Sequence, residues 1–222
     1  MPVITLSRQF GAGGQGIGRS LAERFDGEYL DREVVALAAA RLGIPETEAE
    51  GYDERMPGLW QRLVAALATS SPELAVPPLP SDVVSGPAIG ERLAALTRAV
   101  IEEAADRGNA VILGRGGAFI LRERPGVVRV HLHASFEARV RNMLARVEEA
   151  PADARFDEPS MRELCRRVDT ARAQYLRNRF GVDWNDARHY DLSIDTGRLG
   201  LGRATDLIEA ATRQIASAEG TP

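Results

Sequence analysis

The sequence predicts an α/β fold in which about five parallel strands form one sheet with helices on both faces. Short apolar runs rich in β-branched residues alternate along the chain with longer segments whose apolar residues recur at helical spacing. This alternation favours a parallel sheet, because each crossover between parallel strands leaves room for a helix that covers a face. The 222 residues, 44% of them hydrophobic, can bury one full core, so we expect a single domain over residues 1–222.

The first strand leads into the densest glycine cluster of the chain. An apolar run over Pro2–Leu6 is followed, within residues 11–18, by five glycines, and the spacing of Ile17, Leu21 and Phe25 then indicates a helix. Glycines let backbone N–H groups converge on an anion, and the start of a helix adds unpaired N–H groups and a positive dipole end. The loop is therefore predicted to bind phosphate, and a side chain at Gly13 is expected to fill the space that the phosphate needs. The predicted contacts come from Gly11, Ala12, Gly13, Gly14, Gln15 and Gly16.

Two kinds of phosphate-binding loop compete for these residues. Gly11, Gly13 and Gly16 fit the dinucleotide-binding fingerprint, and Asp31 follows Gly11 by twenty residues, where a ribose-binding acid would lie. The stretch Ser7–Phe10, however, separates the strand from the first glycine and leaves room for the wider loop of phosphoryl-transfer enzymes. All 28 basic residues are arginine, which excludes both the Tyr-x-x-x-Lys pair of short-chain dehydrogenases and the lysine of a Walker loop.

An arginine must therefore reach the phosphates if the loop belongs to a kinase. Arg8 precedes the first glycine, at the carboxyl end of the first strand, where ligands of open α/β sheets bind. Its guanidinium is planar and bidentate toward phosphate, so it is not a geometric copy of lysine. We predict Arg8 as the replacement cation and as a catalytic residue.

The chain between the second and third strands is expected to be a helical insertion over residues 44–108. It contains a proline-rich loop over residues 70–88, and loops of this length are often functional. Asp31 follows the second strand at the N-cap position of a helix. The elements expected here are a strand over 28–30 and helices over 31–42, 56–69 and 89–107.

Later strands bring further charged residues to the ligand-binding edge. The unalternated run Asn109–Leu113 predicts a buried strand, and Arg115 lies just beyond its carboxyl end. His131 and His133 share one face of the next strand, but no third ligand lies nearby, so no metal site is predicted. The remaining expected elements are strands over 127–133 and 190–196 and helices over 135–147, 158–178 and 204–215.

Charge, cysteine content and hydropathy exclude several classes of function. A net charge of -4 argues against non-specific binding of nucleic acid. The single cysteine, Cys165, excludes an internal disulfide, and no apolar run approaches the roughly eighteen residues of a membrane span. Because the N-terminus has no secretory signal either, we expect a cytoplasmic protein with no nucleic-acid or membrane partner.

The order of several motifs along the chain resembles the bacterial cytidylate kinases, and more closely their divergent cytidylate kinase-like relatives. In these relatives Ser-Arg-x-x-Gly-x-Gly-Gly replaces the Walker loop, as Ser7–Gly14 does here. The resemblance covers about residues 3–40 and 109–215. Its motifs are Val3–Leu6 with Gly11–Gly13, Tyr29–Asp31, Gly114–Gly116, Val130–Ser135, Arg139–Met143, Arg167–Arg172 and Ile194–Thr196.

The resemblance implies a P-loop fold and transfer of the γ-phosphoryl group of ATP, with Mg²⁺, to CMP or dCMP. It implies that the glycine loop holds the ATP phosphates and that residues 147–180 form a helical lid. It also implies that Arg115 and Arg167 contact the transferring or acceptor phosphates. The remaining implied substrate contacts are Asp31 at the monophosphate site and Asp169 and Arg172 on the acceptor nucleotide.

Three departures from the family pattern keep alternatives open. Gly14 stands at the position of the Walker lysine, Gln15 and Gly16 replace the hydroxyl that meets Mg²⁺, and Gly116 replaces an acid. Phosphoryl transfer depends on positioning and charge neutralisation, so the lost cation costs several powers of ten in rate unless Arg8 replaces it. The leading hypothesis is a nucleoside monophosphate kinase. The alternatives are a catalytically silent nucleotide-binding regulatory module and a dinucleotide-dependent oxidoreductase; the expected partners are small-molecule nucleotides, with a homodimer left open.

Overall fold

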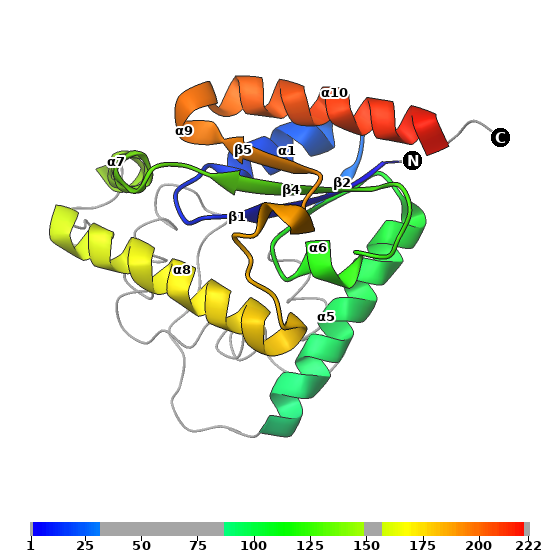
Figure 1. Ribbon diagram of the computed structural model, residues 1–222, viewed down its shortest axis with the longest axis horizontal. Coiled ribbons are helices and arrows are strands. Elements are labelled where there is room, and N and C mark those ends of the chain that lie inside the picture. The colour runs from blue at the N-terminus through cyan, green and yellow to red at the C-terminus, as the bar shows by residue number, and fades with distance from the viewer. Residues whose placement is uncertain (1, 32–86, 149–156, 220–222) are drawn as a thin grey trace.

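The computed structural model describes residues 2–31, 87–148 and 157–219, and it contains one five-stranded parallel sheet (Figure 1). The order of the strands across the sheet is β2-β3-β1-β4-β5. The predicted sheet of about five parallel strands is thereby confirmed. The strands are β1 (Val3–Arg8), β2 (Glu28–Leu30), β3 (Ala110–Leu113), β4 (Val127–His133) and β5 (Leu192–Asp195).

The central strand β1 marks the place where the chain changes direction across the sheet. Val3 of β1 pairs with Ala110 of β3 on one side and with Val127 of β4 on the other. From β1 the chain goes outward to β2, returns to β3, and then crosses to β4 on the opposite side of β1. Open α/β sheets bind ligands at such a switch point, outside the carboxyl ends of the strands. The end of β1, at Arg8, is therefore where the fold offers a binding site.

Helices cover both faces of the sheet, as expected. On one face α1 (Gly14–Arg24) and α10 (Leu201–Glu219) pack side by side, and on the other lie α5 (Pro87–Arg107) and the short α6 (Gly117–Ile120) (Figure 1). Alternate strand residues serve the two faces because the side-chain period of a strand is two. One core cluster contains Ile4, Leu6, Val111, Leu113, Ile17, Leu21, Ala204 and Ile208, and the other contains Val3, Ala110, Ile112, Val100, Ile101 and Ala104.

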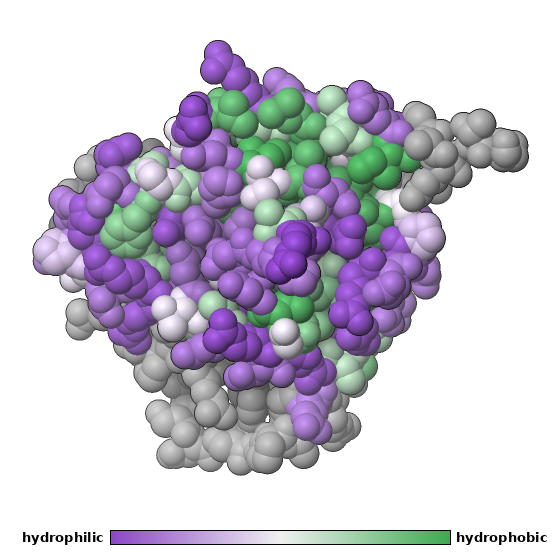
Figure 2. Space-filling model, in the orientation of Figure 1, coloured by the Kyte–Doolittle hydropathy of each residue, from purple (hydrophilic) through white to green (hydrophobic). Residues whose placement is uncertain are grey.

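Two further helices, α7 (Phe136–Glu148) and α8 (Glu158–Phe180), pack against each other toward the carboxyl ends of the strands (Figure 1). The helix α8 has a clear start and stop: the Asp157 side chain accepts the N–H of Ser160 at 2.9 Å, and Gly181 ends the helix in a left-handed conformation. Arg162 of α8 pairs with Glu137 of α7. In Figure 2 hydrophilic residues cover most of the surface over α8, whereas apolar residues gather over α10.

Several predicted elements lie outside the described residues. They are the helices over 31–42 and 56–69, most of the proline-rich loop over 70–88, and the part of the predicted lid over 149–156. The predicted helix over 89–107 corresponds to α5, and the one over 158–178 corresponds to α8. Short elements that the sequence did not indicate are α6, η3 (Ala187–His189) and α9 (Thr196–Leu199). Within the described part of the chain, no helix has the length and apolar character needed to cross a membrane.

Candidate functional site

The glycine loop joins β1 to α1 and depends on two glycines with positive φ. Gly11 has φ 83° and Gly13 has φ 79°, a region that disfavours any residue with a Cβ. A Cβ on Gly11 would lie 2.7 Å from the Arg139 carbonyl oxygen of α7, and a Cβ on Gly13 would overlap the side chain of Leu201 at the start of α10. A side chain at Gly13 would therefore displace the side chain of Leu201, and its effect on the space for phosphate stays a prediction.

Neighbouring elements hold the carbonyl groups of this loop. The Phe10 carbonyl accepts from Arg139 Nη1 at 3.0 Å, the Gly11 carbonyl from Asn142 Nδ2 at 3.1 Å, and the Ala12 carbonyl from Thr196 Oγ1 at 3.0 Å. In a trans peptide the C=O of one residue and the N–H of the next point in opposite directions, and the described chain has no cis peptide. The N–H groups of the residues that follow these carbonyls, Gly11 and Gly13 among them, are thus directed away from the helices that bind the carbonyls.

The start of α1 adds further N–H donors beside the loop, and they have no hydrogen-bond partner among the residues that the structure describes. The first four N–H groups of a helix have no intrahelical partner, and here the earliest such bond runs from Ile17 N to Gly13 O, at 3.3 Å. The four N–H groups belong to the N-cap Gly13 and to Gly14, Gln15 and Gly16, all of which the sequence predicts as phosphate contacts. Amide groups that converge at the positive end of a helix dipole form a site suited to an anion.

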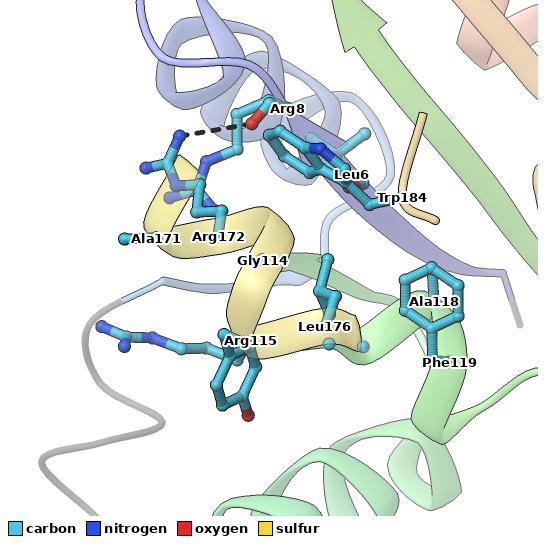
Figure 3. Close-up of a pocket in the computed structure, with 14 residues that line it drawn as sticks. Leu6, Arg8, Gly114, Arg115, Ala118, Phe119, Ala171, Arg172, Leu176 and Trp184 are labelled. Atoms are coloured by element: carbon cyan, nitrogen blue, oxygen red, sulfur yellow. Dashed lines mark hydrogen bonds between the residues drawn. The ribbon is translucent and has the colours of Figure 1, made fainter. Parts of the chain in front are cut away.

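A cavity of about 70 Å³ adjoins the loop at the carboxyl ends of β1 and β3 (Figure 3). Arg8, Arg115 and Arg172 lie on one side of it, whereas Trp184 and Phe119 lie on the other. No aspartate, glutamate or histidine is among the described residues that line this cavity. The cavity therefore combines a cationic side with an aromatic, apolar side.

Arg8 occupies the point where three strand ends meet. Its aliphatic stem packs against Gly14, its guanidinium covers Gly114 at the end of β3, and its Nη2 lies 3.9 Å from Asp31 Oδ1 at the end of β2. The Arg8 carbonyl accepts a hydrogen bond from Arg172 Nη1 at 3.2 Å. A Cβ on Gly114 would overlap Arg8 Nη1, so this glycine is required for the guanidinium to lie where it does.

Arg115 sits in a strained turn. Gly114, Arg115 and Gly116 have φ angles of 75°, 55° and 71°, so three consecutive residues are left-handed. A residue with a side chain pays about 1–2 kcal/mol for this conformation. Such strain is concentrated at ligand sites, where the surrounding structure holds it in place. Tyr175 of α8 lines the same cavity as Arg115. Burial raises the pKa of the Tyr175 phenol, and the positive charge of Arg115 opposes that rise.

Asp31 and Gln15 form a polar link beside the loop. Asp31 is only 8% exposed, and its Oδ2 accepts from Gln15 Nε2 at 3.2 Å. The other end of the Gln15 amide, Oε1, accepts from Arg146 Nη2 of α7 at 3.1 Å. Gln15, which stands where a Mg²⁺-binding hydroxyl was expected, thus lies between a carboxylate and a guanidinium.

The structure brings together some of the sequence-predicted site residues and separates others. Arg8, Arg115 and Arg172 share the cavity, whereas Arg167, half-buried on α8, does not line it. The Asp169 carboxylate is turned to the loop, where Oδ1 accepts the Phe10 N–H at 2.8 Å. Sequence reasoning singled out none of Arg139, Asn142 and Thr196 as loop contacts. Each of the three lies more than a hundred residues from the loop in the sequence, so no local pattern could connect them to it. The one feature of the sequence that pointed to them is that the family motifs contain them.

The strand order, the glycine loop and the cavity at the switch point define this protein as an α/β protein with a P-loop type of fold. A sequence profile of the cytidylate kinase-like family matches residues 3–198, and the chain belongs to this family.

Individual relatives are distant. The cytidylate kinase of Pyrobaculum aerophilum is 32% identical over 102 residues, 46% of this chain and 51% of the relative. That of Halobacterium salinarum is 26% identical over 113 residues, 51% of this chain and 55% of the relative. The chain thus spans about half the length of these curated relatives. An uncharacterized protein from Eubacterium ventriosum shares the fold, with a TM-score of 0.64 at 18% identity over 96% of this chain and 99% of that one.

Proposed function

We propose that this protein is a small-molecule kinase that transfers the γ-phosphoryl group of ATP to a nucleoside monophosphate such as CMP or dCMP. The observation that carries the proposal is the loop in which side chains of α7 and α9 hold three consecutive carbonyls and turn the following N–H groups away. This arrangement suits a polyphosphate. Membership of the cytidylate kinase-like family and the names of the two archaeal relatives support the choice of reaction.

The donor site would use the loop and the first turn of α1. The phosphates of ATP would accept from the N–H groups of Gly11 and of Gly13–Gly16, since the Ala12 N–H already donates to the Gln9 carbonyl at 3.2 Å, and Mg²⁺ would neutralise part of their charge. Magnesium in such sites is usually held by one or two carboxylates, phosphates and water. The described residues contain no cluster of three or more acidic, histidine or cysteine side chains that could hold a metal by themselves. A single carboxylate beside the loop, such as Asp31 next to Gln15, would fit that limited role.

The acceptor would lie in the adjoining cavity. Guanidinium groups bind phosphate oxygens in pairs, so Arg115 and Arg172 would hold the monophosphate, and Arg8 would lie between it and the β- and γ-phosphates of ATP. The aromatic side of the cavity, with Phe119 and Trp184, would face the base. This division matches a ligand with an anionic end and a flat, weakly polar end.

The lining of the cavity also favours a phosphate over an alcohol as the acceptor. An alcohol must lose a proton as it attacks, and kinases that use one supply a carboxylate as a base. A phosphate monoester is mostly ionised near neutral pH because its second pKa is about 6. Its oxygen attacks the γ-phosphorus, the bond from that phosphorus to the β-bridging oxygen breaks, and ADP leaves, with no base required. No acidic or histidine side chain is among the described residues of the lining, which favours the ionised acceptor.

A catalytically silent nucleotide-binding module is the second candidate. Two observations favour it: Gly14 replaces the Walker lysine, and Gly116 replaces the acid that follows the arginine of the third strand. Such a module would keep the donor loop and lose the transition-state contacts, which act only during transfer.

Calorimetric titration with ATP, CMP and NAD, followed by a coupled ADP-release assay over CMP, dCMP, UMP, AMP and GMP, separates the candidates. The proposal expects ATP binding and ADP release that depends on a monophosphate. ATP binding without turnover on any of them selects the silent module. Binding of NAD in preference to ATP overturns both hypotheses and favours the oxidoreductase.

A further inference from the structure

A closed ring of hydrogen bonds holds one residue of the glycine loop from both sides. The Phe10 N–H donates to Asp169 Oδ1 at 2.8 Å, the Phe10 carbonyl accepts from Arg139 Nη1 at 3.0 Å, and the same Nη1 donates to Asp169 Oδ2 at 2.6 Å. We propose that Asp169 and Arg139 are positioning residues whose clamp on Phe10 makes the anion-binding conformation of the loop depend on the docking of α8. The proposal deepens the proposed function and rests on it for its ATP readouts.

The burial of Arg139 makes the clamp specific. The residue is only 6% exposed, and its Nε donates to the Ala134 carbonyl at 3.2 Å. A buried guanidinium is costly unless its charge and its donors are satisfied, and here Asp169 supplies the counter-charge. Both carboxylate oxygens of Asp169 are engaged by the loop and by Arg139. The clamp places Asp169 on the donor side, whereas the family resemblance implies a contact with the acceptor nucleotide.

A second contact, one helical turn further along α8, supports the same dependence. Arg172 follows Asp169 by three residues, so the two side chains project from one side of the helix. Arg172 Nη1 donates to the Arg8 carbonyl at 3.2 Å, and its guanidinium lies 5.8 Å from the centre of the Phe10 ring. The helix thus contacts the backbone just before the loop and inside it. When α8 is displaced, the Arg8 carbonyl and the Phe10 N–H lose their partners together.

The first test uses the unliganded protein and needs no activity. In ¹⁵N-labelled protein, Asp169→Asn should shift the Phe10 amide proton upfield and speed its exchange with solvent, because a neutral amide is a weaker acceptor than a carboxylate. Glu163→Gln is the matched control on the same helix, since Glu163 faces the exposed Arg166, at 4.0 Å. The control should leave the Phe10 amide at its wild-type position. A Phe10 amide that is unchanged in Asp169→Asn overturns the clamp.

The second test separates a donor-side role from an acceptor contact. Asp169→Asn should weaken ATP binding in calorimetry by about tenfold or more, the expected effect of one charge-assisted hydrogen bond. In the ADP-release assay with CMP, the KM for ATP should rise while the KM for CMP stays within about twofold. Arg139→Lys should act in the same direction, because an ammonium cannot reach Ala134, Phe10 and Asp169 at once. Glu163→Gln should change neither constant.

The outcomes remain separable. A loss confined to the KM for CMP overturns the clamp and restores Asp169 as an acceptor contact. Should Arg139→Lys fail to fold, the isosteric Asp169→Asn, in a partly exposed side chain, still decides the question. Absence of ATP binding by the wild-type protein counts against the proposed function, and in that case the Phe10 amide alone confirms or overturns the clamp.

Discussion

At the scale of single residues, the site depends on the position of a positively charged side chain that can replace the missing lysine. Arg8 begins at the end of the central strand, so its guanidinium can lie between Gly114 at the end of β3 and Asp31 at the end of β2, the next strand beyond β3. A lysine in the first turn of α1 would approach the phosphates from the helix, whereas Arg8 approaches from the sheet. The two geometries place the positive charge differently even if they neutralise the same phosphate.

We predict that Arg8→Ala lowers turnover at least about a hundredfold, as the loss of one transition-state charge contact usually does. Arg8→Lys should restore only part of the rate, because a lysine at this backbone position has a side chain of different length and an ammonium group that cannot bind phosphate in the bidentate manner of a guanidinium. The ADP-release assay with CMP measures both variants. Arg177→Ala is the control, since Arg177 is exposed on α8. Wild-type turnover in Arg8→Ala would move the role to Arg115 or Arg167.

A second residue-level prediction concerns Gly114. In Gly114→Ala the methyl group overlaps Arg8 Nη1, so the guanidinium must move and turnover should fall about tenfold or more. The alanine also pays about 1 kcal/mol for a positive φ. Gly181→Ala is a matched control, because Gly181 has φ 69° and none of the described atoms lies within 4 Å of the place that the new methyl group would take. Urea unfolding should show a similar loss of stability in both variants, whereas only Gly114→Ala should lose activity. Equal activities of Gly114→Ala and Gly181→Ala would contradict the inference that Gly114 leaves the space in which the Arg8 guanidinium lies.

At the scale of elements, short connections hold the loop as much as the long helices do. The helix α9 has four residues, yet its first residue, Thr196, has a hydroxyl 3.0 Å from the Ala12 carbonyl and 3.1 Å from the His133 carbonyl. It therefore ties the glycine loop to the end of β4. Helices of one turn, such as α6 and α9, have too few residues to show a period, which is why apolar spacing indicated α1, α7, α8 and α10 and missed these two.

The element-level prediction is that Thr196→Val weakens both the fold and the loop. Valine keeps the shape but leaves the buried Ala12 carbonyl without its partner, which costs about 1–3 kcal/mol in the free energy of unfolding. ATP affinity should fall as well, because the peptide that orients the Gly13 N–H is no longer held. Thr212→Val is the control: its hydroxyl bonds the Ile208 carbonyl within α10, a group that the helix backbone already satisfies. Urea unfolding and calorimetry with ATP measure the two effects, and the prediction is wrong if Thr196→Val binds ATP as tightly as Thr212→Val.

At the scale of the whole molecule, the features that could be predicted are those that depend on short stretches of consecutive residues. Short apolar runs indicated the five strands, the glycines marked the loop, and the position of Arg8 and Arg115 after strands placed them at one edge of a parallel sheet. The contacts that hold the loop could not be predicted in this way. Arg139 is one arginine among 28, and apart from its place in a family motif the local pattern of charge and hydropathy does not distinguish it from the surface arginines that follow it. The packing of α7 against Gly11 and against Asp169 of α8 makes it a buried residue.

The last prediction concerns acid unfolding of the whole domain and the histidine of β4. His131 is 3% exposed, lies 4.9 Å from Tyr190 and 5.6 Å from Trp184 between ring centres, and its Nδ1 has no hydrogen-bond partner within the described residues. Burial, assisted by the nearby His133, lowers the pKa of His131 to about 4. In the unfolded chain a histidine has a pKa of about 6.5.

The sign of the effect follows from these two pKa values. Between about pH 6.5 and about pH 4 the unfolded chain binds a proton at His131 that the folded chain does not, so stability falls as the pH falls through this window. The full loss corresponds to about 3 kcal/mol. His131→Phe fills the same aromatic space without a titrating group, and its free energy of unfolding should therefore fall less between about pH 7 and about pH 5 than that of the wild type. Urea unfolding of both proteins across this range measures the difference. Parallel curves would show that the folded protein accommodates a charged His131, and the acid sensitivity would then have to come from its carboxylates.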